Sequence, residues 1–154
     1  AQKLAEWMFK SRLFSAYGTP EGVLSTILAG RELGLQAMAS LRAFHIIENR
    51  PTMSADLIRA LVMKSGKAKY FRCTERSTQR ATWETQRGDD PPISLTFTIE
   101  EGRQAFSGDD KAWAKSGWGK NPSDLCVARA SSKLARLVYA DIVANLYADA
   151  EFDV

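Results

Sequence analysis

The most regular hydrophobic pattern in this chain lies between residues 93 and 99, where Ile, Leu, Phe and Ile alternate strictly with Ser or Thr. Alternation with a period of two is typical of a strand that buries one face. Looser alternation over residues 69–76 and 79–87 indicates two more strands, and the run Gly88–Pro92 supplies a turn before the third. We predict that these three runs form an antiparallel three-stranded meander.

Helical spacing dominates the rest of the sequence. Thr19 followed by Pro20, and Ser54 before a periodic apolar run, are typical helix starts, whereas Gly66 is a typical residue after a helix end. Apolar residues at helical spacing predict helices over residues 2–14, 20–34, 36–41, 55–65 and 100–106.

Three shorter segments have other patterns. Residues 43–48 indicate a short strand, and Asn49–Pro51 has turn chemistry. Residues 107–120 are polar and contain glycine, so we predict a loop there that holds Trp113 and Trp118.

The longest uninterrupted pattern predicts a helix from Asn121 to Leu146, with no Gly or Pro after Pro122. Asn121 can cap this helix, Pro122 suits its first position, and Asp124 lies in its first turn, where the helix dipole favours negative charge. Residues three or four apart share a face, so apolar and cationic side chains occupy different sides. The apolar side holds Val127, Ala130, Leu134 and Val138, and the cationic side holds Arg129, Lys133 and Arg136.

These elements predict an α+β fold, in which a small antiparallel three-stranded sheet packs with several helices and the last helix is long and basic. The 154 residues are enough for one domain, 1–154, with a sizeable core. No apolar run approaches the roughly 20 residues needed to span a bilayer, so we expect no membrane partner. The chain lacks an initiator Met, and we expect it to be a fragment of a longer protein.

Positive charge concentrates in the middle of the chain, although the net charge is only +3. Between residues 64 and 87, seven cations are opposed only by Glu75 and Glu84, which gives +7 − 2 = +5. The cationic row of the last helix also has no Asp or Glu three or four residues away. Rows of this kind favour a polyanionic partner such as a phosphate backbone. The seven cations are Lys64, Lys67, Lys69, Arg72, Arg76, Arg80 and Arg87.

The chain lacks the residues that several kinds of catalysis need. A P-loop needs Gly five residues before the Gly of a Gly-Lys pair, but Leu61 and Ala114 stand there, so we expect no ATP site and no cofactor. One His, His45, and two distant cysteines, Cys73 and Cys126, are too few ligands for zinc. We predict that both cysteines are buried and that the protein is not an enzyme, with no catalytic and no metal-binding residue.

Tryptophan adds a second binding chemistry, because its ring can stack on bases. We expect Trp83 in the sheet core, whereas Trp118 fits base stacking and core packing equally well. Asp109 and Asp110 leave one enzymatic alternative open, since as metal ligands they would support magnesium-dependent strand cleavage. Solvated loop charges are the simpler interpretation of this pair.

The order of the segments resembles the RecT family of phage single-strand annealing proteins, which is related more distantly to the Red beta protein of phage lambda. The resemblance rests on the run Gly30–Leu35, on Pro51–Met53 entering a helix that ends with Lys64–Gly66, and on the strands after it. A Trp-containing loop before a helix with regularly spaced Arg and Lys completes the match. The similarity covers about residues 24–147.

The resemblance implies an ATP-independent protein of phage homologous recombination that coats single-stranded DNA and anneals a complementary strand into duplex. It also implies rings or helical filaments, a small sheet surrounded by helices, a positively charged DNA groove, and the cytoplasm of a bacterial host. A phage exonuclease and a host single-strand-binding protein are the partner proteins it suggests. By the same resemblance, we expect the strand region to be shorter than in some members and this fragment to lack the family's C-terminal, partner-binding region.

By this resemblance, Arg129, Lys133 and Arg136 correspond to the family's basic helix, and Lys64 and Lys67 to a basic patch beside the groove. Charge and position add six further candidates for DNA contact: Lys69, Arg72, Arg76, Arg80, Trp118 and Lys120. A second function stays open, namely a non-catalytic interaction or structural module whose basic face binds an acidic protein.

Overall fold

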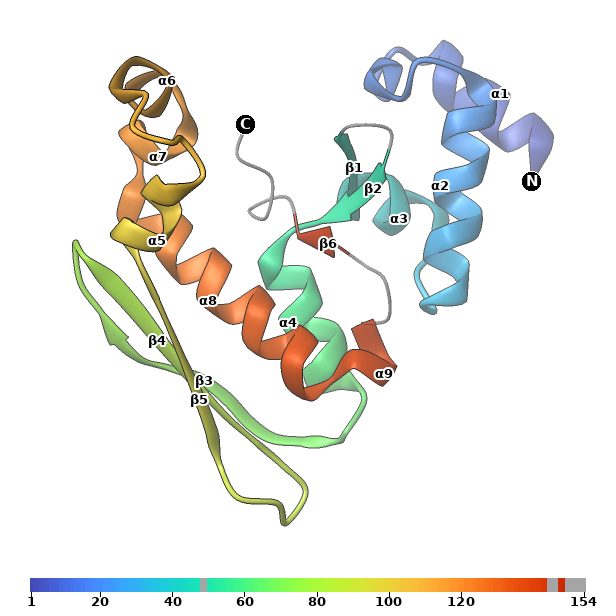
Figure 1. The fold of residues 1–154 in the computed structure, drawn as a ribbon. Helices are drawn as coiled ribbons and strands as arrows, with labels where there is room; N and C mark the ends of the chain where they lie inside the picture. Colours follow the sequence, from blue (N-terminus) through green and yellow to red (C-terminus); the bar gives the residue numbers. More distant parts are fainter. Residues whose placement is uncertain (48–49, 144–146, 149–154) are drawn as a thin grey trace. The chain divides into compact units, whose positions relative to one another are not determined.

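The computed structural model describes residues 1–47, 50–143 and 147–148, and its backbone groups into two compact units, residues 1–53 and 54–154 (Figure 1). The single domain predicted for residues 1–154 stays a prediction. The predicted fold class is confirmed: the fold is α+β, and a three-stranded antiparallel sheet packs against a long helix in the second unit.

Helices and one β-hairpin make up the first unit. The side chain of Thr19 accepts the N–H of Gly22 and Pro20 takes the first helical position, as predicted. The first helix ends earlier than predicted, and Arg12 just beyond it adopts a left-handed conformation with φ 61°. The elements are α1 (Gln2–Lys10), the 3-10 helix η1 (Ser15–Tyr17), α2 (Pro20–Glu32), α3 (Ala37–Ala43), β1 (Phe44–Ile47) and β2 (Arg50–Met53).

Strand β2 corrects the predicted turn at Asn49–Pro51. Arg50 and Pro51 belong to this strand, which pairs antiparallel with β1 so that Phe44 lies opposite Met53. A proline is tolerated in a strand where the ladder does not need its missing N–H. Glu48 and Asn49, the ends of the predicted strand and turn, lie outside the described residues.

Close contacts hold the first unit together. A Cβ on Gly30 of α2 would lie 1.9 Å from the Oγ atom of Ser40 on α3, so only glycine permits this approach. The Tyr17 hydroxyl lies 2.6 Å from the carbonyl oxygen of Leu41 and 2.5 Å from that of Phe44, and therefore joins η1 to the junction of α3 and β1. The buried centre of the unit consists of Ala5, Val23, Ile27 and Leu41.

The second unit begins with a capped helix, as predicted. The Ser54 side chain accepts the N–H of Leu57, and Gly66 after the helix has φ 74°. The elements of this unit are α4 (Ala55–Lys64), β3 (Ala68–Arg76), β4 (Arg80–Arg87), β5 (Ile93–Thr98), α5 (Ile99–Gln104), α6 (Asp110–Lys115), α7 (Gly117–Lys120), α8 (Pro122–Val138), α9 (Ala140–Val143) and β6 (Tyr147–Ala148).

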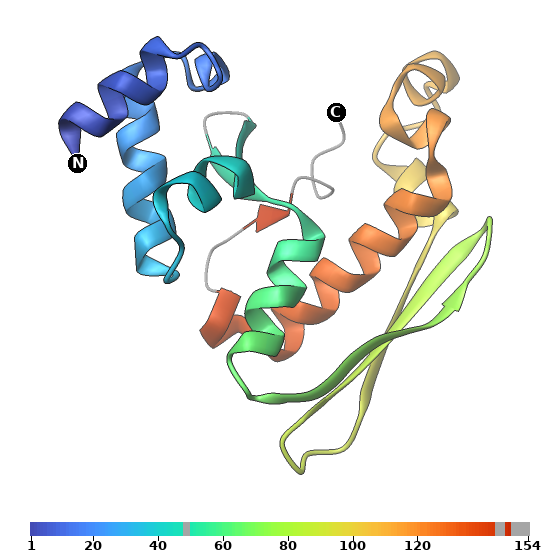
Figure 2. The ribbon, with the colours of Figure 1, turned by 180° about the vertical axis from the view of Figure 1, so that it is seen from behind.

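The predicted meander is confirmed, with strand order β3-β4-β5 and antiparallel pairing throughout. Ala81, Trp83 and Phe97 are buried on the face that α8 covers. Side chains at alternate positions, such as Thr82 and Thr96, point to the other face, which no described helix of this unit covers (Figure 2). The sheet is therefore half-buried, as its period-two pattern predicts.

The long helix is shorter than predicted. It ends at Val138 rather than Leu146, because Tyr139 leaves the helical conformation with φ −121° and ψ 37°. The Tyr139 hydroxyl lies 2.6 Å from the Oγ1 atom of buried Thr85, so this side chain turns into the sheet instead of continuing the helix. The short helix α9 follows, and residues 144–146 lie outside the described part of the chain.

The predicted loop over residues 107–120 is wrong, because two short helices form there. Asp109 accepts the N–H groups of Lys111 and Ala112 at the start of α6, and Ser116 accepts that of Trp118 at the start of α7. These caps supply the first hydrogen bonds of helices too short to show a hydrophobic period.

The cysteine prediction is half right. Cys126 on α8 is fully buried, and burial raises the pKa of its thiol to about 11. Cys73 is exposed, because β3 is an edge strand and a bulge displaces its backbone between Cys73 and Glu75. No helix in the described residues is both long and apolar enough to cross a lipid bilayer.

The contact between α5 and the Trp118 ring gives a test of this packing. A Cβ on Gly102 would lie 2.8 to 3.0 Å from three carbon atoms of that ring. We expect Gly102→Ala to lower the free energy of unfolding by about 1–3 kcal/mol, the usual cost of overpacking a core. Gln104→Ala, at an exposed position of the same helix, is the control, and equal stability of the two variants in urea unfolding would contradict the contact.

Candidate nucleic-acid interface

Helix α8 is enclosed on two sides. The sheet covers one side, where Cys126, Ala130 and Leu134 are buried against β4 and β5, and α4 lies along another (Figure 1). Three more residues of α8 are buried and small, which suits the close approach of a neighbouring helix: Ser131, Ser132 and Ala135. Little of this helix surface is therefore left to face solvent.

The remaining side of α8 carries the predicted cations. We call Arg129, Lys133 and Arg136 the cation strip. Lys133 is exposed, and the other two side chains are half-buried. From first to last residue the strip extends about 10 Å along the helix axis, at 1.5 Å per residue.

Aromatic rings support two members of the strip. The Lys133 Nζ atom lies 4.7 Å from the centre of the Phe97 ring on β5, and the Arg129 guanidinium carbon lies 5.8 Å from the same ring. The Trp118 ring is also 5.8 Å from that guanidinium carbon. Each such contact contributes about 0.5–1 kcal/mol at an exposed site, so both cations are directed toward the β5 side of the helix.

Trp118 itself is removed from the candidate DNA contacts. It is 1% exposed, its ring stacks on Trp113 with centroids 5.7 Å apart, and it packs on Phe97 at 5.8 Å. With its ring covered, no base can stack on it. The Trp118 ring instead contacts the Arg129 guanidinium. Trp83 is also in the core, as predicted.

The predicted charge excess of the strand region is largely neutralised. Besides Glu75 and Glu84, the structure brings Asp89, Asp124 and Asp141 to these cations, so the local sum falls from +5 to +7 − 5 = +2. The pairs and their N–O distances are Lys67–Asp141 (2.5 Å), Lys69–Asp89 (3.1 Å), Arg72–Glu84 (2.9 Å), Arg76–Asp124 (2.5 Å), Arg80–Glu75 (2.7 Å) and Arg87–Asp141 (2.7 Å).

These cations also lie on different sides of the unit. Arg72 and Arg80 point to the open face of the sheet, because they are in register with Glu84 and Thr98 on that face. Arg76 pairs with the first turn of α8, whereas Lys67 pairs with α9 beyond the other end of α8. The structure therefore does not gather the predicted strand cations into one site with the cation strip.

Two predicted lysines keep an exposed position without an ion pair in the described residues: Lys64, the last residue of α4, and Lys120, the last residue of α7. Lys120 directly precedes the start of α8, nine residues before Arg129. Lys69 lies on the edge strand β3 at the first of its two bulges, where it pairs with Asp89.

Glu84 organises the open face of the sheet. Its carboxylate accepts hydrogen bonds from the Tyr70 hydroxyl and the Arg72 guanidinium, each at 2.9 Å. The bond from Arg72, followed by that from Tyr70, holds the pKa of Glu84 below its ordinary value. The Arg72 guanidinium carbon also lies 4.5 Å from the centre of the Tyr70 ring. These two contacts hold Arg72 on the open face of the sheet.

Asp109 and Asp110, the metal ligands of the enzymatic alternative, both have structural partners. Asp109 caps α6, and Asp110 forms an ion pair with Arg103. The described residues hold no group of three His, Cys, Asp or Glu side chains that could bind a metal ion.

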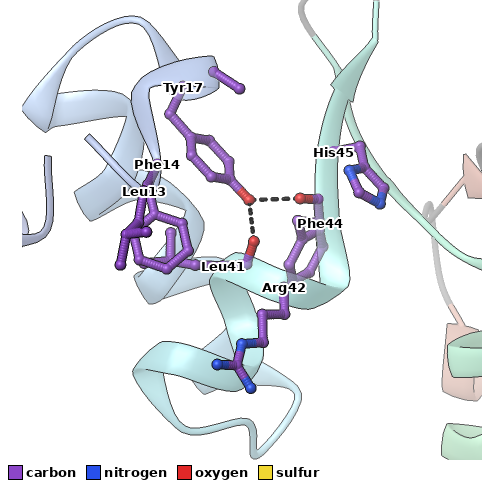
Figure 3. A pocket seen from close by; sticks show the side chains of 8 residues that line it. Leu13, Phe14, Tyr17, Leu41, Arg42, Phe44 and His45 are labelled. Atoms are coloured by element: carbon purple, nitrogen blue, oxygen red, sulfur yellow. Dashed lines mark hydrogen bonds between the residues drawn. The ribbon is translucent and has the colours of Figure 1, made fainter. Parts of the chain in front are cut away.

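His45 borders a pocket in the first unit (Figure 3). The pocket measures about 370 Å³ and has mainly apolar walls, formed by side chains such as Leu13, Phe14 and Phe44. The Tyr17 hydroxyl in its wall is bonded to two main-chain carbonyls, and burial raises the pKa of Tyr17. The His45 side chain points away from the other labelled residues, and the pocket brings no nucleophile to it.

Sequence reasoning missed two sets of residues. The sequence predicts Phe97, which supports the cations of α8, only as part of the buried face of a strand, although its place in a period-two strand beside a basic helix is an available signal. The sequence predicts Asp124 only in the first turn of the long helix and Asp141 only within that helix, and no local pattern links them to Arg76 or Lys67.

A scan against protein-family models finds no match to this chain, and a search of curated proteins finds no significant match either.

The cluster around Asp141 gives a prediction about stability. Arg87 donates two hydrogen bonds to this carboxylate, at 2.7 and 2.8 Å, and Lys67 donates one at 2.5 Å, and these bonds hold the pKa of Asp141 far below its ordinary 3.8. Because the folded state favours the ionised form, the stabilisation is complete above that value and declines as the pH falls below it.

We therefore expect Asp141→Asn to lower the melting temperature at pH 7, and the difference from the parent protein to narrow below pH 3.8. Asp89→Asn is the matched control, since Asp89 is fully exposed and forms a single 3.1 Å pair with Lys69. A melting temperature that Asp141→Asn leaves unchanged at pH 7 would show that the cluster does not stabilise the fold.

Proposed function

We propose that this protein binds single-stranded DNA through the cation strip of α8 and anneals complementary strands without ATP. One observation carries the proposal: α8 packs against the sheet and α4, and its remaining side carries exposed Lys133 in a row with half-buried Arg129 and Arg136. A row of cations on a rigid element matches a phosphate backbone, whose charges also form a row.

The geometry supports backbone contact rather than sequence reading. Phosphate contacts position a strand without sensing its sequence, and the strip consists of cations without Asn or Gln to recognise base edges. A strand held by its phosphates keeps its bases available for a complementary strand, as annealing requires. The resemblance to the RecT family supports single-stranded DNA as the phosphate carrier.

The same resemblance supports the remaining parts of the proposal. The protein would act in the cytoplasm of a bacterial host during phage recombination, as rings or helical filaments on DNA. Filament growth needs surfaces on two different sides of each copy. A phage exonuclease and a host single-strand-binding protein are the proposed partner proteins.

Binding is tested by removing two members of the strip. We expect Arg129→Ala with Lys133→Ala to weaken binding of a (dT)20 oligonucleotide and to lower the slope of log K against log salt by about 1.4, at about 0.7 for each phosphate that the variant no longer neutralises. Fluorescence anisotropy over a salt series measures both quantities, and a thermal melt confirms that the variant folds.

The matched control is Arg72→Ala with Arg80→Ala, which removes the same charge from the open face of the sheet. We expect this control to bind nearly as the parent protein does. If the two double variants lose affinity and salt dependence equally, net charge rather than the cation strip determines binding.

Annealing is a separate step and has its own test. We expect the protein to accelerate pairing of two complementary labelled oligonucleotides in the absence of nucleotide, measured by energy transfer between the labels. The strip variant should lose this acceleration in proportion to its lost affinity. If the protein binds DNA but does not accelerate pairing, the annealing part of the proposal is wrong and the DNA-binding part stands.

A further inference from the structure

Strand β5 has an open edge in the described residues, since it pairs with β4 alone. The N–H of Ile99 donates to the carbonyl of Gln79 directly across the ladder, at 2.9 Å. Hydrogen-bonded positions alternate in an antiparallel pair, so those of β5 that face β4 are residues 93, 95 and 97. The main-chain N–H and C=O groups of Ser94 and Thr96 therefore point away from the sheet.

The two edges of this sheet differ in their protection. The edge strand β3 carries two bulges and the charged residues Lys69, Arg72, Glu75 and Arg76. Bulges and charges are the common means by which proteins prevent another strand from pairing with an edge. β5 has neither: its sequence Ile-Ser-Leu-Thr-Phe-Thr is uncharged and its register with β4 is regular.

Positive charge lies beside this unprotected edge. Arg129 and Lys133 contact the ring of Phe97 on β5, whereas α4, on another side of α8, packs on β3. A strand added to β5 would lie about 4.8 Å farther out and would direct alternate side chains toward the α8 side of the sheet. Carboxylates at those positions would approach the two cations.

We propose that the open edge of β5 binds an extended acidic segment of a partner protein, with carboxylates at alternate positions facing Lys133 and Arg129. Main-chain hydrogen bonds to Ser94 and Thr96 supply the pairing, and the alternate carboxylates supply the selectivity. The usable edge is short, because Pro91 and Pro92 precede it and the N–H of Thr98 is bonded to the Glu101 carboxylate at 2.8 Å.

This inference does not rest on the proposed DNA binding, but the two share Lys133 and Arg129. A bound acidic segment and a DNA strand should therefore compete. Competition would let an acidic partner displace the protein from DNA. It would also prevent the protein from binding DNA for as long as the acidic partner is bound.

The probe is a synthetic peptide with the sequence of residues 147–154, because Asp149, Glu151 and Asp153 alternate there with apolar residues. At ten times its Kd, we expect the peptide to slow hydrogen exchange of the Ser94 and Thr96 amides about tenfold, since only the free fraction exchanges. The same peptide with its acids changed to Asn, Gln and Asn should bind at least several-fold more weakly. Absence of protection at these amides would overturn the proposal.

Thr96→Pro tests the edge without touching the ladder, because it removes an N–H that points away from β4. Thr96→Ala keeps that N–H and loses the hydroxyl, which lies 2.7 Å from the Thr82 hydroxyl, and is the matched control. We expect Thr96→Pro, but not Thr96→Ala, to abolish peptide binding. Binding of (dT)20 should stay unchanged. Lys133→Ala should weaken both.

Two other outcomes separate the hypotheses. If the peptide protects the edge but the cation-strip variant still binds DNA normally, the DNA proposal fails and this inference stands. If no peptide binds and Thr96→Pro dissociates an oligomer of the parent protein, the edge pairs with a second copy and the inference of an acidic partner is overturned.

Discussion

The burial of α8 between the sheet and α4 is the constraint on which the second unit depends. Leu134 is fully buried on the sheet side, and Trp83 of β4 is covered in turn by the Arg59 guanidinium of α4, 4.5 Å from its ring. Fully burying a side chain such as leucine contributes roughly 1.5–3 kcal/mol, so the helix cannot rotate without exposing several buried side chains to water. The direction of the cation strip is therefore a consequence of core packing.

Ion pairs are the second influence on the cations of this unit. Exposed ion pairs contribute little to stability, typically about 0–1 kcal/mol, yet they determine which cations remain available to a polyanion. The pairs around Glu84 and Asp141 commit Arg72, Lys67 and Arg87 to carboxylates of the same unit. Lys133 instead rests on the Phe97 ring, a contact that leaves its charge uncompensated by a carboxylate of the described residues.

Local patterns predicted much of this fold. The period of two predicted the meander, and the caps at Thr19 and Ser54 predicted two helix starts, because in each case the signal lies within a few residues. The end of α8 was missed since Tyr139 leaves the helix for a hydrogen bond with Thr85, 54 residues away. The ion pair between Arg76 and Asp124, 48 residues apart, and the packing of Trp118 on Phe97 also join segments that no local pattern links.

Lysine footprinting with a single-stranded oligonucleotide tests the central claim most directly. The protein is acetylated with and without (dT)20, and modification at each lysine is measured by mass spectrometry. Strand binding along α8 predicts strong protection of Lys133, whereas Lys69, paired with Asp89 on the edge strand β3, should react equally in both samples. Protection of Lys69 with unchanged reactivity of Lys133 would place the DNA elsewhere and contradict the account.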